Sequence, residues 1–212
     1  MDPVLVIWDC DGVLVDSERP GTRVLAESLT AAGLPMAAEE AAARFKGGSM
    51  QAVVAWAEER LGRALPAGFL EDHRARSFRA FREEVRATEG VVEALDRIAR
   101  PGCVASGGPP EKMRLTLGVA GLLPRFEGRL FSSYEVGSWK PDPGLFLHAA
   151  RAMGAPPARC VVIEDSVPGV RAAVAAGIPV FGFADLTPEA DLAAAGAHPF
   201  RRMEDLPGLL LG

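Results

Sequence analysis

The chain has 212 residues, of which 49% are hydrophobic, and it carries a net charge of −5. This length allows one large domain or one domain with an insertion, and the acidic balance argues against nucleic acid or an anionic membrane surface as a partner. Its three cysteines lack metal-ligand spacing, and no apolar run suits a signal peptide or a membrane span, so we expect a cytoplasmic protein with free thiols.

The first predicted element is a buried strand at residues 4–8, because VLVIW is short, apolar and free of polar alternation. A helix is expected over residues 17–33, ending at Gly33. Residues 36–87 indicate helices only, since their apolar residues recur three and four positions apart. Glycine- and proline-containing stretches at 47–48 and 65–68 separate these helical segments.

From Gly90 onward, strand patterns alternate with helix patterns. The later strands are expected at residues 103–106, 129–133, 160–164 and 179–183. This alternation predicts parallel βαβ units and an α/β fold with a Rossmann-like, doubly wound parallel sheet. Because the first strand precedes the helical segment, we predict a core domain made of residues 1–16 and 89–212, interrupted by a helical domain at residues 17–88.

Ionisable and hydroxyl side chains stand at or just beyond the ends of the predicted strands. In chain order they are Asp9, Asp11, Ser106, Lys140, Glu164 and Asp165. Ligands of parallel α/β sheets bind at the carboxyl ends of the strands, so these side chains are expected to form one site. Lysine is rare in this arginine-rich chain, occurring only at positions 46, 112 and 140, which suggests a chemical reason for each.

Four carboxylates in one crevice repel each other, so either some are protonated or a cation lies among them. The predicted ligands are all oxygen atoms, with no histidine or cysteine contribution, which favours a hard ion such as Mg²⁺. His73, His148 and His198 are interpreted as structural or solvated residues.

Four segments resemble the motifs of the haloacid dehalogenase-like phosphohydrolases, in the order of that family. DCDGVLVDSE is similar to the first motif, DxDGxxxDS/T, and VVIEDSVPGVRAAVAAGIPV to the acidic fourth motif. VASGG supplies the serine of the second motif, and KPDPGLF the lysine of the third. The resemblance covers nearly the whole chain and implies that residues 17–88 are the α-helical cap found after the first motif in one subfamily.

This resemblance implies a role for each site residue. Asp9 would be the nucleophile that forms an aspartyl-phosphate, and Asp11 the general acid that later serves as base. Ser106 would donate a hydrogen bond to phosphate, and Lys140 would offset negative charge. The Mg²⁺ ion would be held by Asp9, the Asp11 backbone carbonyl and Asp165, with Glu164 acting directly or through a water. The expected substrate-binding residues are Ser17, Lys46, Gly47 and Gly107.

The resulting prediction is a monomeric, Mg²⁺-dependent phosphatase acting on a small phosphate ester, such as a sugar or sugar-acid phosphate. LFSSYEVGSWKPDPGLFLHAARAMG is similar to bacterial phosphatases acting on 6-phosphogluconate, although Gly107 stands where that subgroup tends to carry asparagine. A β-phosphoglucomutase-like mutase, a phosphoglycolate phosphatase and a non-catalytic phosphoester-binding protein remain alternatives. Mutases carry a histidine where this chain has Gly21 and an arginine where it has Met50, which favours hydrolysis.

Overall fold

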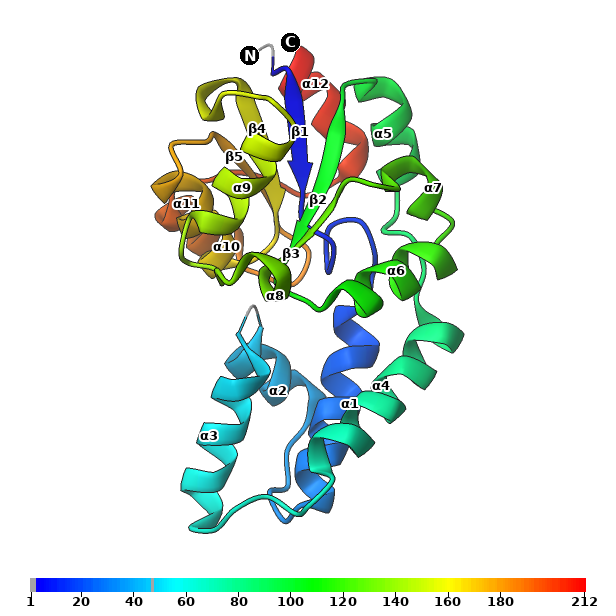
Figure 1. The fold of residues 1–212 in the computed structure, drawn as a ribbon, viewed down its shortest axis with the longest axis vertical. Helices are drawn as coiled ribbons and strands as arrows, with labels where there is room; N and C mark the ends of the chain where they lie inside the picture. Colours follow the sequence, from blue (N-terminus) through cyan, green and yellow to red (C-terminus); the bar gives the residue numbers. More distant parts are fainter. Residues whose placement is uncertain (1–2, 47) are drawn as a thin grey trace.

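The computed structural model describes residues 3–46 and 48–212 (Figure 1). Its strands are β1 (Leu5–Trp8), β2 (Gly102–Ser106), β3 (Leu130–Ser132), β4 (Cys160–Glu164), β5 (Val180–Phe183) and β6 (His198–Phe200). Its helices are α1 (Glu18–Ala31), α2 (Ala38–Phe45), α3 (Met50–Leu61), α4 (Phe69–Glu84), α5 (Val91–Ile98), α6 (Pro110–Val119), α7 (Leu123–Phe126), α8 (Ser133–Val136), α9 (Gly144–Ala152), α10 (Val167–Ala175), α11 (Glu189–Ala195) and α12 (Leu206–Leu211), with short 3₁₀ turns at Pro157–Arg159 and Met203–Asp205.

The six strands form one parallel sheet in the order β3-β2-β1-β4-β5-β6. The chain moves outward from β1 through β2 to β3, then crosses back to β4 on the other side of β1. This reversal beside β1 is the position where α/β sheets of this kind open a crevice at their carboxyl edge. The predicted doubly wound α/β fold is confirmed.

Both faces of the sheet are covered by helices, which explains the unbroken apolar run of β1. Its Leu5 and Ile7 pack into a cluster with α9, α10 and α11, whereas Val6 and Trp8 pack into a second cluster with α5, α6 and α12. All four side chains are buried. A strand buried on both faces has no position for a polar side chain, so alternation disappears.

The carboxyl-terminal part of the sheet departs from the sequence prediction. Strand β6, at the edge beside β5, and helix α11 before it were not predicted. The strand has three residues and contains Pro199, which lacks a backbone N–H and is tolerated because the strand lies at an edge. The closing apolar segment forms α12, whose Leu206 and Leu210 are fully buried in the core.

Helices α1 to α4 form a helical block beyond the carboxyl ends of the strands (Figure 1). It has its own small apolar cluster, which includes Leu25, Leu29 and Val53. Two chain segments join it to the core, and they pair with each other: Val15 bridges Ala87, and the Thr88 N–H donates to the Leu14 carbonyl at 3.1 Å. We propose that residues 17–88 constitute the cap domain. Within the described ranges, no helix combines the length and apolar character needed to cross a membrane.

Candidate active site

Asp9 follows β1 directly and is only 6% exposed. The Lys140 ammonium, from the loop between α8 and α9, lies 2.6 Å from Asp9 Oδ1 and 2.6 Å from Glu164 Oε1. Burial raises the pKa of Asp9 to about 7; Lys140 opposes this shift, and the neighbouring carboxylates of Glu164 and Asp11 add to it. Burial alone would lower the pKa of Lys140, but Asp9 and Glu164 raise it above its usual value. Lys140 is therefore a buried cation fixed between two acidic groups.

Glu164 ends β4 and is fully buried. Its Oε2 accepts hydrogen bonds from the backbone N–H groups of Asp165 and Ser166, both at 2.8 Å, and from the Ser166 hydroxyl at 2.9 Å. Its Oε1 accepts from Lys140. A Cβ at Gly169, in the first turn of α10, would lie 1.8 Å from Glu164 Oε1. Only glycine leaves room for this carboxylate, which anchors the loop that carries Asp165.

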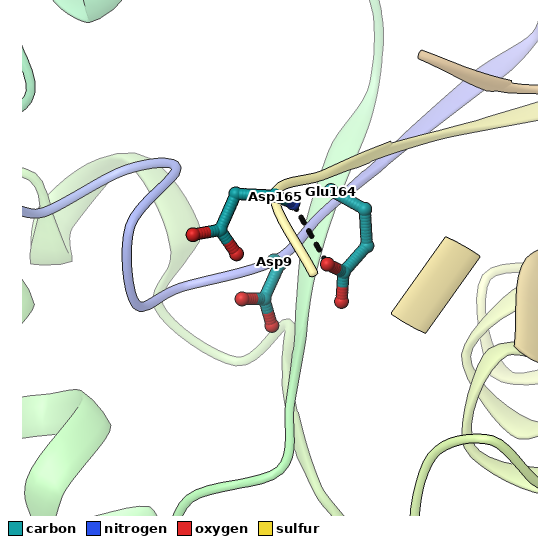
Figure 2. A group of neighbouring side chains, drawn as sticks. All are labelled: Asp9, Glu164 and Asp165. Carbon is teal, nitrogen blue, oxygen red and sulfur yellow. Dashed lines mark hydrogen bonds between the residues drawn. The ribbon is translucent and has the colours of Figure 1, made fainter. Parts of the chain in front are cut away.

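Asp9, Glu164 and Asp165 form a buried acidic cluster whose ligand oxygens lie within 4.8 Å of one another (Figure 2). Burial raises the pKa of Asp165 well above its usual value; Lys46 opposes this and Glu164 adds to it. Gly12 has φ +77°, and a Cβ there would lie 2.2 Å from Asp165 Oδ2. Concentrated buried negative charge with oxygen-only donors fits a hard divalent cation such as Mg²⁺.

Asp11 lies beside this cluster, with both carboxylate oxygens engaged by donors. The Ser17 hydroxyl donates to Oδ1, and the Lys112 ammonium lies 3.0 Å from Oδ2. Burial would raise the pKa of Asp11, but Lys112 and Ser17 outweigh it and hold the pKa below its usual value. The side chain of Asp11 is not part of the acidic cluster of described residues, and the metal contact predicted for its backbone carbonyl stays a prediction.

Each lysine of the chain pairs with a different aspartate at this edge of the sheet. Lys140 contacts Asp9, Lys112 contacts Asp11, and Lys46 Nζ lies 2.7 Å from Asp165 Oδ2. Sequence reasoning assigned Lys140 and Lys46 to the site but gave Lys112 no role, and its rarity was the one signal available. Lys46, expected to bind substrate, lies against Asp165, a predicted metal ligand.

Ser106, Gly107 and Ser17, the remaining predicted residues that the structure describes, lie around the same edge. Ser106 is 1% exposed, and its Oγ accepts a hydrogen bond from the Gly108 N–H at 3.0 Å. A Cβ at Gly107 would meet no described atom within 4 Å, so the first carbon of a side chain, such as that of the asparagine in the resembled subgroup, would meet no obstacle. Ser17 contacts Asp11 as described. The predicted substrate-binding residue Gly47 lies outside the described residues.

Comparison with known proteins agrees with this architecture. Residues 4–177 match the family model for haloacid dehalogenase-like hydrolases. The 6-phosphogluconate phosphatase of Escherichia coli (strain K12) is 37% identical over 179 residues, which are 84% of this chain and 81% of that protein. The crystal structure of a haloacid dehalogenase-like protein of unknown function from Agrobacterium tumefaciens str. C58 is 36% identical, with a TM-score of 0.87 over 98% of this chain and 97% of that one. A putative β-phosphoglucomutase from Thermotoga maritima is 27% identical, with a TM-score of 0.78 over 98% of each chain.

A family-model match over most of the chain, together with these relatives, defines the class of protein. The chain belongs to the haloacid dehalogenase-like hydrolases. Within that family it is a phosphatase, which confirms the enzyme class predicted from the motifs.

Proposed function

We propose that the protein is a Mg²⁺-dependent phosphatase that hydrolyses a small phosphate ester through an aspartyl-phosphate on Asp9. The observation that carries this proposal is the buried group of Asp9, Lys140, Glu164 and Asp165 at the carboxyl edge of β1 and β4. A carboxylate so fixed, with an ammonium 2.6 Å away, suits attack on a phosphorus atom whose oxygens carry negative charge.

In the first step, Asp9 Oδ attacks phosphorus and the bond from phosphorus to the ester oxygen breaks. Asp11 gives its proton to the departing oxygen, and Lys140 and Ser106 stabilise charge on the phosphoryl group. When bound by Asp9, the Asp11 carbonyl and Asp165, Mg²⁺ would offset negative charge on the phosphoryl oxygens and on Asp9. Glu164 keeps Lys140 and the loop of Asp165 in place. Its Oε1 accepts a hydrogen bond from Lys140, and its Oε2 accepts one from the backbone N–H of Asp165.

In the second step, Asp11 takes a proton from a water molecule that attacks the phosphorus of the aspartyl-phosphate, which releases phosphate and restores Asp9. The pKa of Asp11 in the free protein lies below its usual value, so the carboxyl group is ionised and able to accept this proton. For the first step it must carry a proton, and a phosphate dianion entering beside it raises the pKa of a carboxyl group.

The proposed substrate class is a sugar or sugar-acid phosphate handled in the cytoplasm. Support comes from the 37% identical 6-phosphogluconate phosphatase and from Lys46, a cation that the helical block contributes to the site.

The mutase alternative needs a second phosphate site. A Cβ added at Gly21 would lie 3.6 Å from the Phe81 ring, and Met50 packs against the apolar cluster of the helical block, so neither position supplies a cation for that phosphate.

The direct test replaces Asp9 with asparagine and measures release of phosphate from 4-nitrophenyl phosphate, with and without Mg²⁺. We expect Asp9→Asn to lower kcat by at least about 10⁴-fold, because covalent catalysis loses its nucleophile. Wild-type activity should disappear with a chelator and return with Mg²⁺. Equal turnover by wild type and Asp9→Asn would disprove the aspartyl-phosphate mechanism.

A product assay separates the alternatives. β-Glucose 1-phosphate with its bisphosphate activator should give free phosphate, whereas accumulation of glucose 6-phosphate would establish a mutase. Tight binding of phosphate esters without any phosphate release in the presence of Mg²⁺ would indicate a binding protein.

A further inference from the structure

Lys112 of the core contacts both Asp11 and a residue of the helical block. It lies in the first turn of α6, and its Nζ is 3.0 Å from Asp11 Oδ2. The same ammonium lies 5.2 Å from the centroid of the Phe81 ring, which belongs to α4 of the helical block and is 4% exposed. The Lys112 side chain is 22% exposed and that of Asp11 15%. This is a largely enclosed ion pair, covered on one side by an aromatic face.

The two oxygens of Asp11 are held from different parts of the chain. Ser17, which precedes α1 on the first segment entering the helical block, donates to Oδ1. Lys112, on α6 of the core, holds Oδ2. Two donors on opposite oxygens fix both the position and the rotation of a carboxylate, whereas one donor leaves it free to rotate. Proton transfer requires this precision, because its efficiency depends on the donor's position relative to the departing oxygen.

We propose that Lys112 is a positioning residue for the phosphatase reaction: it orients the Asp11 carboxyl for proton transfer to the leaving group, and the Phe81 ring keeps the ammonium in place. Lys112 does not act on phosphorus in this inference; Lys140, 2.6 Å from Asp9, supplies the charge next to the nucleophile. This inference rests on the proposed function, since it assigns Lys112 a part in the step that Asp11 carries out.

The test compares leaving groups in wild type and Lys112→Met. 4-Nitrophenolate departs as a stable anion and needs little protonation, whereas an alkoxide needs a full proton. We expect Lys112→Met to lower kcat/KM by about 100-fold for an alkyl phosphate and by less than about threefold for 4-nitrophenyl phosphate, in line with the usual contribution of general acid catalysis. A series of aryl phosphates of decreasing leaving-group quality should fall between these limits. Lys112→Arg, which keeps a cation beside Asp11, should recover most of the loss.

Arg114→Met is the matched control, because Arg114 lies on the same helix and forms an exposed ion pair with Glu127. It should change kcat/KM equally little for every substrate. Ser17→Ala removes the other donor to Asp11 and should reproduce the leaving-group dependence, which keeps the test decisive if Lys112→Met is poorly folded. Thermal unfolding of each variant monitors the fold.

Equal losses on all substrates in Lys112→Met, or no loss on any, would overturn the positioning role while leaving the proposed function intact. If wild type itself released no phosphate from any ester, the proposed function would fail, and the role of Lys112 with it.

Discussion

The core and the helical block both contribute a lysine to the site, but in different surroundings. Lys140 of the core is 8% exposed, contacts two buried carboxylates and lies over the Phe146 ring. Lys46 of the block follows the end of α2, is 14% exposed and, among the described residues, forms an ion pair with Asp165 alone. The difference suggests a division of labour. On the proposed function, the groups that meet phosphorus lie at the carboxyl edge of the sheet, whereas Lys46, the group proposed to recognise the rest of the substrate, is carried by a helical block joined through two chain segments.

The largest effect is expected for Gly169→Ala, which tests whether the core holds Glu164 in one position. The new Cβ would lie 1.8 Å from Glu164 Oε1, so the carboxylate must move away from Lys140 and from the loop at residues 165–166. Breaking a buried ion pair and its hydrogen bonds destabilises the folded state by about 3 kcal/mol or more. We expect a loss of that size in the free energy of unfolding, measured with urea, and loss of nearly all activity.

Gly118→Ala is the control for this substitution. Gly118 is an exposed position near the end of α6, where a Cβ would lie 3.9 Å from Leu123 Cδ2, an ordinary van der Waals distance. Alanine in a helix interior is favoured over glycine by up to about 1 kcal/mol, so this variant should be as stable as wild type or slightly more stable. Equal stability of Gly169→Ala and wild type would show that Glu164 is not held rigidly.

The helical block should be the more acid-sensitive region, because His73 of α4 is buried there. Its ring nitrogens lie 3.2 Å from the Ser28 hydroxyl and 3.4 Å from the Ser77 hydroxyl. Burial, assisted by Arg76 and Lys112, lowers the pKa of His73 from 6.5 to about 4. The unfolded chain therefore binds a proton that the folded one excludes, and stability present above pH 6.5 is lost as the pH falls towards 4. At pH 5 this linkage amounts to about 2 kcal/mol.

Urea unfolding of wild type and His73→Gln at pH 7.5 and pH 5 measures this effect. Glutamine keeps hydrogen-bonding capacity without a titrating group, so the variant should lose about 2 kcal/mol less than wild type between the two pH values. His148→Gln, at an exposed position on α9, should behave as wild type does. The same pH dependence in His73→Gln would assign the acid sensitivity to other groups.

The sequence predicted the sheet and the acidic edge because both depend on local pattern. VLVIW and CVVIE are continuous apolar runs, and such runs require burial on both faces; the acids that follow them must then lie at the strand ends. Contacts between distant segments had no such local signal. The pairing of Lys112 with Asp11 spans the whole helical block, and strand β6 has three residues with a proline.

The role of Glu164 shows the same limit. From sequence it remained open whether this residue binds a metal directly or through a water. Its hydrogen bonds to Lys140, Asp165 and Ser166 depend on the tight start of α10 at Gly169. A motif identifies the residue type at such a position, but the partner of each oxygen is decided by how the loop folds back on the strand.

The smallest expected effect concerns the helical block and its Lys46. If Lys46 recognises an anionic part of the substrate, Lys46→Met should raise KM for 6-phosphogluconate about tenfold, equivalent to about 1.4 kcal/mol. The change for glucitol 6-phosphate, the open-chain analogue with a hydroxymethyl group in place of the carboxylate, should be much smaller, and kcat should change little for either substrate. Steady-state kinetics on this pair of substrates isolates the carboxylate, because the phosphorylated carbon is the same.

Arg44→Met provides the control, since Arg44 lies on α2 but pairs with Glu40 and lies over the Trp56 ring. Its KM values for both substrates should match those of wild type. Lys46 also contacts Asp165, so the alternative hypothesis is that Lys46 affects metal binding alone. That role predicts an altered Mg²⁺ requirement and equal changes in KM for both substrates. Because the two roles change different quantities, one set of rate measurements at several Mg²⁺ concentrations decides between recognition by the helical block and support of the core.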